Sequence, residues 1–256
     1  MKQATAYTYH FLHSAIYLLL AVFMLLQVAY SVQPKEPAND VMIKHALAPF
    51  AGRTVDGIFD YLDRIRPAPI NESDKKYLLR DMTLVTGEAA VRDPAQIQKL
   101  KQRVRGTLAL HRRINIVDFY IFRYPYPGAM NKPGAFIAVT TTLLQMVGDD
   151  ETALIGIVSH ELAHEYVASE MTDAHNKNDL ARMRELELFC DAVAASSLVA
   201  LGLDPARYAV VLERIATSSK EMLKLNNGER EMPNVELRKR LIAEVVAQLT
   251  PTSPTH

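Results

Sequence analysis

The sequence predicts a mainly helical α+β domain with a small β-sheet, preceded by an apolar N-terminal helix. Three observations support this fold class. Apolar residues recur at helical spacing through most of the chain on both sides of residues 114–140. Within 114–140, two short runs are rich in the β-branched and aromatic residues typical of strands. The segment 11–32 is apolar and carries no charge, which sets it apart from the rest.

The composition limits the classes of partner. Hydrophobic residues make up 49% of the chain, enough to bury a sizeable core. Lys+Arg and Asp+Glu number 29 each, so no charge excess favours nucleic acid, and no nucleic-acid partner is expected. The single cysteine, Cys190, rules out an internal disulfide and leaves the redox compartment undetermined. The oligomeric state is also left open.

Residues 11–32 are long enough to cross a bilayer, so residues 1–32 are expected to be a signal peptide or a membrane anchor. An uncleaved anchor uses the full length and attaches the protein to the membrane. A signal peptide uses the tighter apolar core 16–28 and is cleaved near Ala29-Tyr30-Ser31. The residues leave both interpretations open. A buried core helix is the plainer alternative, but helices apolar on all sides are seldom found at a chain start.

Helical patterns follow as far as residue 110. The first covers Asp56 to Ile65 and ends before a proline. The second covers Asp74 to Glu88. In the third, Asp93 is a helix cap followed by proline at the first helical position, and the helix runs to about Leu110. Basic residues lie opposite its apolar stripe, which indicates a solvated face rather than a nucleic-acid surface.

The periodicity then changes to that of strands. Ile114 to Phe122 is predicted to form one strand, and Ala135 to Thr140 a second. The Pro- and Gly-containing segments 124–128 and 133–134 predict turns between them. A short helix, Thr141 to Val147, is expected next.

The central helix, from about Glu151 to Glu170, follows an acidic cap and contains His160-Glu161-Leu162-Ala163-His164. Residues four apart project from the same face of a helix, so the two histidines can bind one Zn²⁺. Glu161 would lie beside the open coordination position. There it can take a proton from the metal-activated water and pass it to the leaving amine. The plainer alternative is a surface helix with coincident spacing.

Three further helices are predicted after the polar segment 171–178. They span Asp179 to Leu201, Asp204-Pro205 to about Ser219, and about Val235 to Leu249, followed by a flexible tail at 251–256. The domain therefore covers about 33–250.

The first of these helices offers a third metal ligand. Glu187 and Asp191 are four residues apart and share a face. Glu187 can reach the metal while Asp191 accepts a hydrogen bond from a ligand histidine and fixes its tautomer. Glu185 is the rival for the ligand position, and Cys190 is interpreted as a small buried hydrophobe.

At this point the chain resembles the M48 family of zinc metallopeptidases, the Ste24/HtpX/Oma1-like group. Their His-Glu-x-x-His and downstream Glu-x-x-x-Asp are matched by His160, Glu161, His164, Glu187 and Asp191. Further similarities are the Pro133-Gly134 turn, the strand ending in Val139-Thr140, and Gly202-Leu203-Asp204-Pro205. The resemblance covers about residues 110–240, and it departs from the family at Met232, where a histidine is usual.

The resemblance implies a zincin-like fold of the gluzincin type and one Zn²⁺ per chain, bound by His160, His164 and Glu187. Glu161 would be the general base and acid, and Asp191 would orient a ligand. Arg238 would be a second stabiliser of the oxyanion or a structural ion-pair partner. An exposed edge strand would bind a polypeptide as an added strand. The residues expected to form that edge strand are Phe136, Ile137, Ala138, Val139 and Thr140.

The expected activity is cleavage of internal peptide bonds. The resemblance implies substrates among misfolded or membrane-associated proteins, as part of protein quality control. The expected location is the bacterial cell envelope, on the periplasmic side, either anchored or exported. Two alternatives remain open: a zinc-binding chaperone or assembly factor with little or no proteolysis, and an exopeptidase.

Overall fold

We describe the protein from a computed structural model over residues 38–86, 90–91, 93–225 and 232–250. The predicted signal or anchor at 1–32 and the tail at 251–256 lie outside these residues. Within them, no helix combines the length and the apolar character needed to cross a bilayer.

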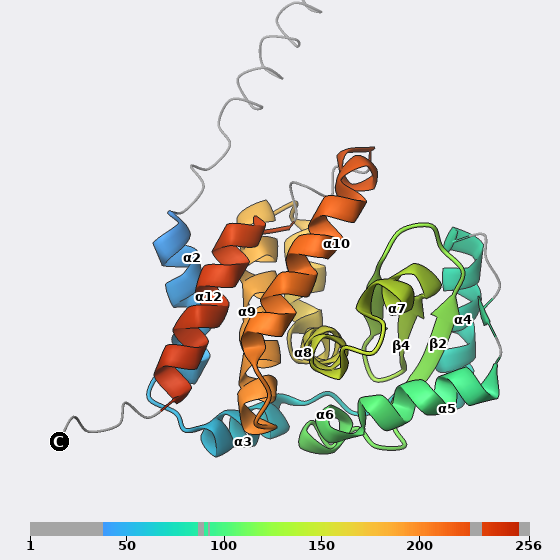
Figure 1. Cartoon of the computed structure of the whole chain (residues 1–256), viewed down its shortest axis with the longest axis horizontal. Helices are drawn as coiled ribbons and strands as arrows, with labels where there is room; N and C mark the ends of the chain where they lie inside the picture. The colour runs from blue at the N-terminus through green and yellow to red at the C-terminus, as the bar shows by residue number, and fades with distance from the viewer. Residues whose placement is uncertain (1–37, 87–89, 92, 226–231, 251–256) are drawn as a thin grey trace, which may run out of the picture. The chain divides into compact units, whose positions relative to one another are not determined.

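The described chain has the mainly helical α+β architecture that the sequence predicts (Figure 1). The elements in chain order are α2 (Asn39–Leu47), η1 (Ala48–Phe50), α3 (Val55–Ile65), α4 (Glu72–Thr86), β1 (Ala90–Val91), α5 (Pro94–Arg103), α6 (Arg105–Leu110), β2 (Asp118–Phe122), β3 (Ala129–Lys132), β4 (Phe136–Thr140), α7 (Thr141–Val147), α8 (Glu151–Asn176), α9 (Leu180–Ala200), α10 (Pro205–Leu225) and α12 (Val235–Leu249).

Helix α8 lies between a helical layer and the sheet (Figure 1). It packs against α9 and α10 on one side and against β3 and β4 on the other, while α9 is covered in turn by α2 and α12. Asp150 caps α8, because its side chain accepts a hydrogen bond from the Ala153 N–H at 3.0 Å. The core residues Leu154, Val158 and Leu162 hold this helix in place. Side chains on α8 are therefore positioned by packing on two sides.

Helix α8 is longer than predicted. It continues to Asn176, past the expected end at Glu170 and through most of the segment interpreted as a polar linker. Ala174 is buried in the core and Met171 packs against it, so apolar contacts continue along the helix. The predicted α3, α4, α7, α9 and α12 are confirmed to within a few residues, and α10 extends six residues beyond its expected end at Ser219.

Two predictions between residues 94 and 122 were wrong. The single helix expected over 94–110 is two helices, because Val104 leaves helical geometry at φ −103° and ψ 10°. Val104 is fully buried, so the break between the two helices lies in the packed core. The strand expected from Ile114 begins only at Asp118. Before it, Ile116 and Val117 both donate their N–H groups to the Arg113 carbonyl, so turns replace the strand ladder.

The sheet has the strand order β1-β2-β4-β3. Strand β4 pairs in parallel with β2, with Val139 opposite Ile121, and antiparallel with β3, with Val139 opposite Ala129. The prediction that Phe136–Thr140 is the exposed edge was therefore wrong. Four of the five residues of β4 are buried, as in a strand that has neighbours on both edges. The turn at Pro133-Gly134 places β3, which the sequence did not predict, at the edge beside α8.

Candidate metal centre

His160 and His164 project from the same face of α8, as their spacing predicts. Possible ligand atoms of His160, Glu161 and His164 all lie within 4.8 Å of one another. The two imidazole centroids are 5.0 Å apart, and the rings meet edge to face at 81°. A rigid helix thus presents two nitrogen ligands and one carboxylate to a common point.

Glu187, on α9, joins this cluster. Its Oε2 lies 3.3 Å from His160 Nε2, and its Oε1 lies 3.8 Å from His164 Nε2. The rival Glu185 does not, because its carboxylate accepts hydrogen bonds from His45 Nδ1 at 2.8 Å and Arg182 Nη1 at 2.9 Å. The packing of α8 on α9 therefore brings together the three ligands expected from the sequence, and it separates Glu187 from its rival.

Asp191 lies behind the cluster, fully buried, and accepts four hydrogen bonds. His160 Nδ1 donates at 3.0 Å and the Tyr208 hydroxyl at 2.7 Å. Arg238 donates from Nε at 2.6 Å and from Nη2 at 2.7 Å. Burial by itself would raise the pKa of Asp191, but Arg238 and His160 outweigh it and lower the pKa. The ionised carboxylate keeps the proton of His160 on Nδ1, so that Nε2 faces the cluster.

Arg238 was expected either to stabilise an oxyanion or to form a structural ion pair, and the structure shows the ion pair. The residue is buried, and both Nε and Nη2 are bound to Asp191. Burial lowers the pKa of Arg238, but the Asp191 carboxylate outweighs burial and raises it.

Glu161 lies in a dry environment beside the histidines. Its side chain is buried, and burial is the largest influence on its pKa, which is raised although His164 and His160 act in the opposite direction. A carboxylate with a raised pKa is a better proton acceptor near neutral pH, as a general base requires.

The electrostatics of the cluster suit a divalent cation. For His160, burial lowers the pKa, but Asp191 and Glu187 together outweigh burial and raise the pKa to about 10. The carboxylates of Glu161 and Asp191 are buried and that of Glu187 is partly buried, and all three lie close to two imidazoles, so the site attracts positive charge. Two imidazole nitrogens and one carboxylate form a ligand set that zinc accepts in catalytic sites. The residues present therefore fit a zinc ion.

Cys190 contacts the second histidine. Its Sγ lies 3.6 Å from His164 Nδ1, a sulfur hydrogen-bond distance. The thiol is fully buried, and burial raises its pKa well above the usual value. The sequence indicated a small buried hydrophobe at this position, and the structure adds the contact with His164.

Sequence reasoning missed four residues that shape the site. Tyr208, at the start of α10, binds Asp191, and only its place just after the Gly-Leu-Asp-Pro turn could have pointed to it. Asn131 Nδ2 on β3 donates to the Glu161 carbonyl at 2.6 Å. Arg113 and Glu165 form a buried ion pair, and Glu165 follows His164 directly in the sequence. These residues contact partners in distant parts of the chain, so the spacing of residues along the sequence does not identify them.

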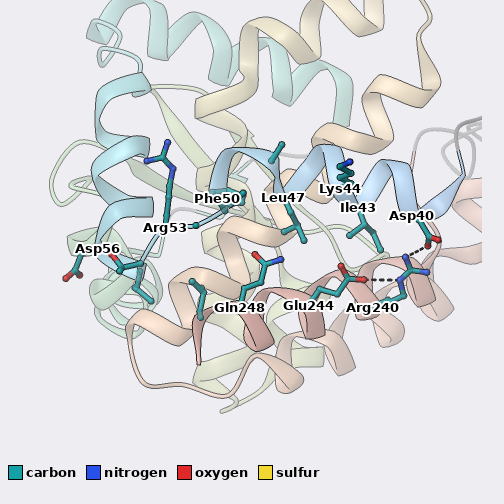
Figure 2. Close-up of a pocket in the computed structure, with 16 residues that line it drawn as sticks. Asp40, Ile43, Lys44, Leu47, Phe50, Arg53, Asp56, Arg240, Glu244 and Gln248 are labelled. Carbon is teal, nitrogen blue, oxygen red and sulfur yellow. Dashed lines mark hydrogen bonds and ion pairs between the residues drawn. The ribbon is translucent and has the colours of Figure 1, made fainter. Parts of the chain in front are cut away.

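A groove of about 1300 Å³ lies elsewhere, between α2 with η1 and α12 (Figure 2). Ile43, Leu47 and Phe50 form part of its wall, and Arg240 on α12 forms ion pairs there with Glu244 at 3.2 Å and with Asp40. His160, His164 and Glu187 are not among its lining residues. This groove is distinct from the metal centre.

The fold and the site together define a metal-dependent hydrolase of the His-Glu-x-x-His class. The sequence model of peptidase family M48 matches residues 95–231, more than half of the chain, and the chain belongs to this family. Membership implies metallopeptidase activity. The matched segment contains both histidines and Glu187, whereas Arg238 lies beyond it. No curated protein matches the chain.

Proposed function

We propose that this protein is a zinc-dependent endopeptidase that binds its substrate as an extended strand. The observation that carries the proposal is the convergence of His160, His164 and Glu187 from α8 and α9 beside the buried carboxylate of Glu161. Those three residues would hold one zinc ion, which when bound polarises the scissile carbonyl and lowers the pKa of the attacking water. Glu161 accepts the proton from that water and delivers it to the leaving amine.

The outer edge of β3, with which no described strand pairs, supports a strand-binding mode. In an antiparallel pair, every second residue exchanges hydrogen bonds with its neighbour. Thr140 N–H donates to the Gly128 carbonyl at 2.9 Å, which makes that pair hydrogen-bonded. Hydrogen-bonded pairs recur at every second residue, so Met130, two residues after Gly128, is hydrogen-bonded to Ala138 of β4. The backbone groups of Ala129 and Asn131 therefore point away from β4, to the outer edge of β3. An extended peptide can pair with those groups.

Cleavage of internal bonds is favoured over removal of terminal residues. An exopeptidase holds the terminal carboxylate or amine of its substrate with a charged group. The buried arginines Arg113 and Arg238 each bind a carboxylate of the protein itself, Glu165 and Asp191 respectively, so neither is available for the terminal carboxylate of a substrate. Pairing along a strand also binds backbone on both sides of the scissile bond.

The decisive experiment combines metal analysis with proteolysis by the full-length protein and by Glu161→Gln. We expect about one zinc per chain in both proteins, cleavage of casein by the native protein, and no cleavage by the variant. Glu151→Gln, an exposed change at the start of the same helix, is the matched control and should remain active. Mass spectrometry should find products cut at internal bonds. Full activity of Glu161→Gln would refute the mechanism, and release of terminal residues alone would identify an exopeptidase.

The same variant separates the protease from a zinc-binding chaperone or assembly factor. Glu161→Gln keeps the proposed zinc ligands and β3, so a chaperone that holds clients on this edge would retain its cellular role. A protease would lose it.

We also propose that the protein acts in the bacterial cell envelope, on the periplasmic side, on misfolded or membrane-associated proteins. The apolar segment 11–32 supports this location. Fractionation of cells and sequencing of the mature N-terminus test it. A mature chain beginning near residue 32 indicates a cleaved signal peptide, an intact chain in the membrane fraction indicates an anchor, and an intact chain in the cytosol contradicts the proposal.

A further inference from the structure

A buried ion pair between Arg113 and Glu165 lies next to the metal centre and includes none of the proposed metal ligands. Arg113 and Glu165 have side-chain exposures of 2% and 1%. Arg113 Nε donates to Glu165 Oε2 at 2.6 Å, and its Nη2 donates to the Pro67 carbonyl at 3.0 Å. Removing two charges from water is costly, and apolar residues of similar volume often serve the fold as well. Stability alone is therefore a weak explanation for this pair.

The other oxygen of Glu165 binds the turn of the β3–β4 hairpin. Gly134 N–H donates to Glu165 Oε1 at 3.2 Å. Gly134 has φ +70°, and a Cβ there would lie 3.0 Å from the Ala68 carbonyl oxygen, so glycine is needed both for conformation and for space. The Ile70 N–H in turn donates to the Gly134 carbonyl at 3.2 Å. The turn is thus held on both sides.

A second contact ties the same hairpin to α8 one helical turn earlier. Asn131 Nδ2 donates to the backbone carbonyl of Glu161 at 2.6 Å. The hairpin is therefore attached to the helix that carries the proposed general base at two points, residues 161 and 165. In the described part of the chain, β3 has a hydrogen-bonded strand neighbour on one side, so the sheet alone does not fix its distance from α8.

We propose that Asn131 and the Arg113–Glu165 pair are positioning residues that hold the substrate-binding edge of β3 in register with Glu161 and the metal cluster. This inference rests on the proposed endopeptidase function and deepens it. A peptide paired with the outward groups of Ala129 and Asn131 has its scissile carbonyl placed by the position of β3. A displacement of about 1 Å at a reacting centre lowers the rate on the order of a hundredfold.

The predicted signature is a loss that depends on substrate length. A long peptide uses strand pairing to position its scissile bond, whereas a short blocked dipeptide makes few or no such pairs. Loosening the hairpin should therefore reduce kcat/KM for the long peptide by about tenfold to a hundredfold. The kcat/KM for the short substrate should change by less than about threefold, since the zinc ligands and Glu161 are unaltered.

The test compares native protein with Asn131→Ala and with the double variant Arg113→Met/Glu165→Met, all full-length. The double change replaces the buried pair by apolar side chains and removes the acceptor for the Gly134 N–H, while avoiding an unpaired buried charge. Arg240→Gln, which removes the exposed ion pairs of Arg240 with Asp40 and Glu244, is the control and should match native protein on both substrates. Zinc content and melting temperature are measured for every protein.

Selective loss on the long peptide, with zinc content and folding retained, supports the proposal. Folded, zinc-loaded variants whose kcat/KM on the long peptide stays within twofold of native would overturn it, as would equal losses on both substrates. A peptide with N-methylated backbone amides extends the test, because it cannot pair fully with β3 and should be insensitive to both variants. If the native protein holds zinc poorly and cleaves neither substrate, the proposed endopeptidase function itself fails.

Discussion

Arg238 on α12 binds Asp191 on α9 through two hydrogen bonds, from Nε to Oδ2 at 2.6 Å and from Nη2 to Oδ1 at 2.7 Å. Asp191 also accepts from His160 Nδ1, so a helix near the C-terminus supports the metal cluster through one carboxylate. The charge of Arg238 keeps Asp191 ionised in a fully buried position, where an unpaired carboxylate would be costly. The orientation of His160 thus depends on a residue 78 positions away in the sequence.

Removing this guanidinium should therefore weaken both folding and metal binding. We expect Arg238→Met to lower the free energy of unfolding by roughly 3–5 kcal/mol, because it leaves the buried carboxylate of Asp191 without its arginine charge partner. Zinc affinity should fall by up to about tenfold to a hundredfold, because Asp191, the hydrogen-bond partner of the ligand His160, loses the group that holds it in place. Urea unfolding and competition with a chelating dye measure the two effects. Arg240→Gln, two residues further on and exposed, is the control. An unchanged zinc affinity in Arg238→Met would contradict this role.

Gly156 is predicted to be intolerant of any side chain. A Cβ at this position would lie 2.7 Å from Cγ and Cδ2 of Tyr208 and 2.8 Å from its Cβ. These atoms belong to the base of the side chain, so Tyr208 cannot move aside without shifting α10 against α8. Gly156→Ala should destabilise the protein by about 1–3 kcal/mol through overpacking, and it should weaken the bond from Tyr208 to Asp191.

A double-mutant cycle checks this mechanism by unfolding measurements. Tyr208→Ala removes the ring, and with it the close contacts at Cγ and Cδ2, so Gly156→Ala should cost less in that background than in native protein. An equal loss of unfolding free energy in both backgrounds would show that the new methyl group does not destabilise the protein through the Tyr208 ring.

The buried His111 should make the folded protein less stable in acid. It is fully buried between α8 and α9, with Nδ1 2.8 Å from the Tyr166 hydroxyl and Nε2 2.9 Å from Ser197 Oγ. Burial, then the nearby charges of Arg113 and Arg66, lower its pKa from 6.5 to about 3. Between these values the unfolded chain binds a proton that the folded protein does not. The free energy of unfolding therefore decreases as the pH falls from about 7 toward 3.

At pH 5 this single group accounts for a loss of about 2 kcal/mol relative to pH 8. His111→Gln does not titrate, so its unfolding free energy should decline less over the same range, even if the variant is weaker at pH 8. Denaturant unfolding at several pH values measures the difference in slope. His175→Gln, at an exposed position, should keep the native slope. Parallel curves for native protein and His111→Gln would exclude the effect.

The parts of the site that could be predicted are those set by local helix geometry. His160 and His164 are one turn apart on any helix, and Glu187 and Asp191 likewise share a face. The preference for Glu187 over Glu185 followed from that shared face. In the structure, α9 places Glu187 toward the histidines and Glu185 toward His45 and Arg182.

The parts that could not be predicted depend on how distant segments meet. The buried run Phe136–Thr140 fits either an interior strand or a covered edge, and only the return of the chain through β3 decides between them. Val104 breaks a helix whose apolar stripe continues on both sides. The contacts of Tyr208 and Arg238 with Asp191 require α10 and α12 to be docked on α9. The spacing of residues along the sequence does not predict these tertiary contacts.

Metal removal should reveal which residues bind the ion. An ion that binds the folded state alone adds about 1.4 kcal/mol of stability for each tenfold rise in its free concentration above Kd. The melting temperature of native protein should therefore rise steadily with free zinc and fall on addition of a chelator. His164→Ala and Glu187→Ala lose a proposed ligand, so their melting temperatures should respond much less.

Glu185→Gln is the matched control for Glu187→Ala, because it lies on the same helix and binds His45 and Arg182 rather than the cluster. Its melting temperature at low zinc can be lower than that of native protein, since it weakens the contact between α2 and α9. The increase per tenfold of zinc should nevertheless equal the native value. A native response in Glu187→Ala together with a lost response in Glu185→Gln would reassign the third ligand to Glu185.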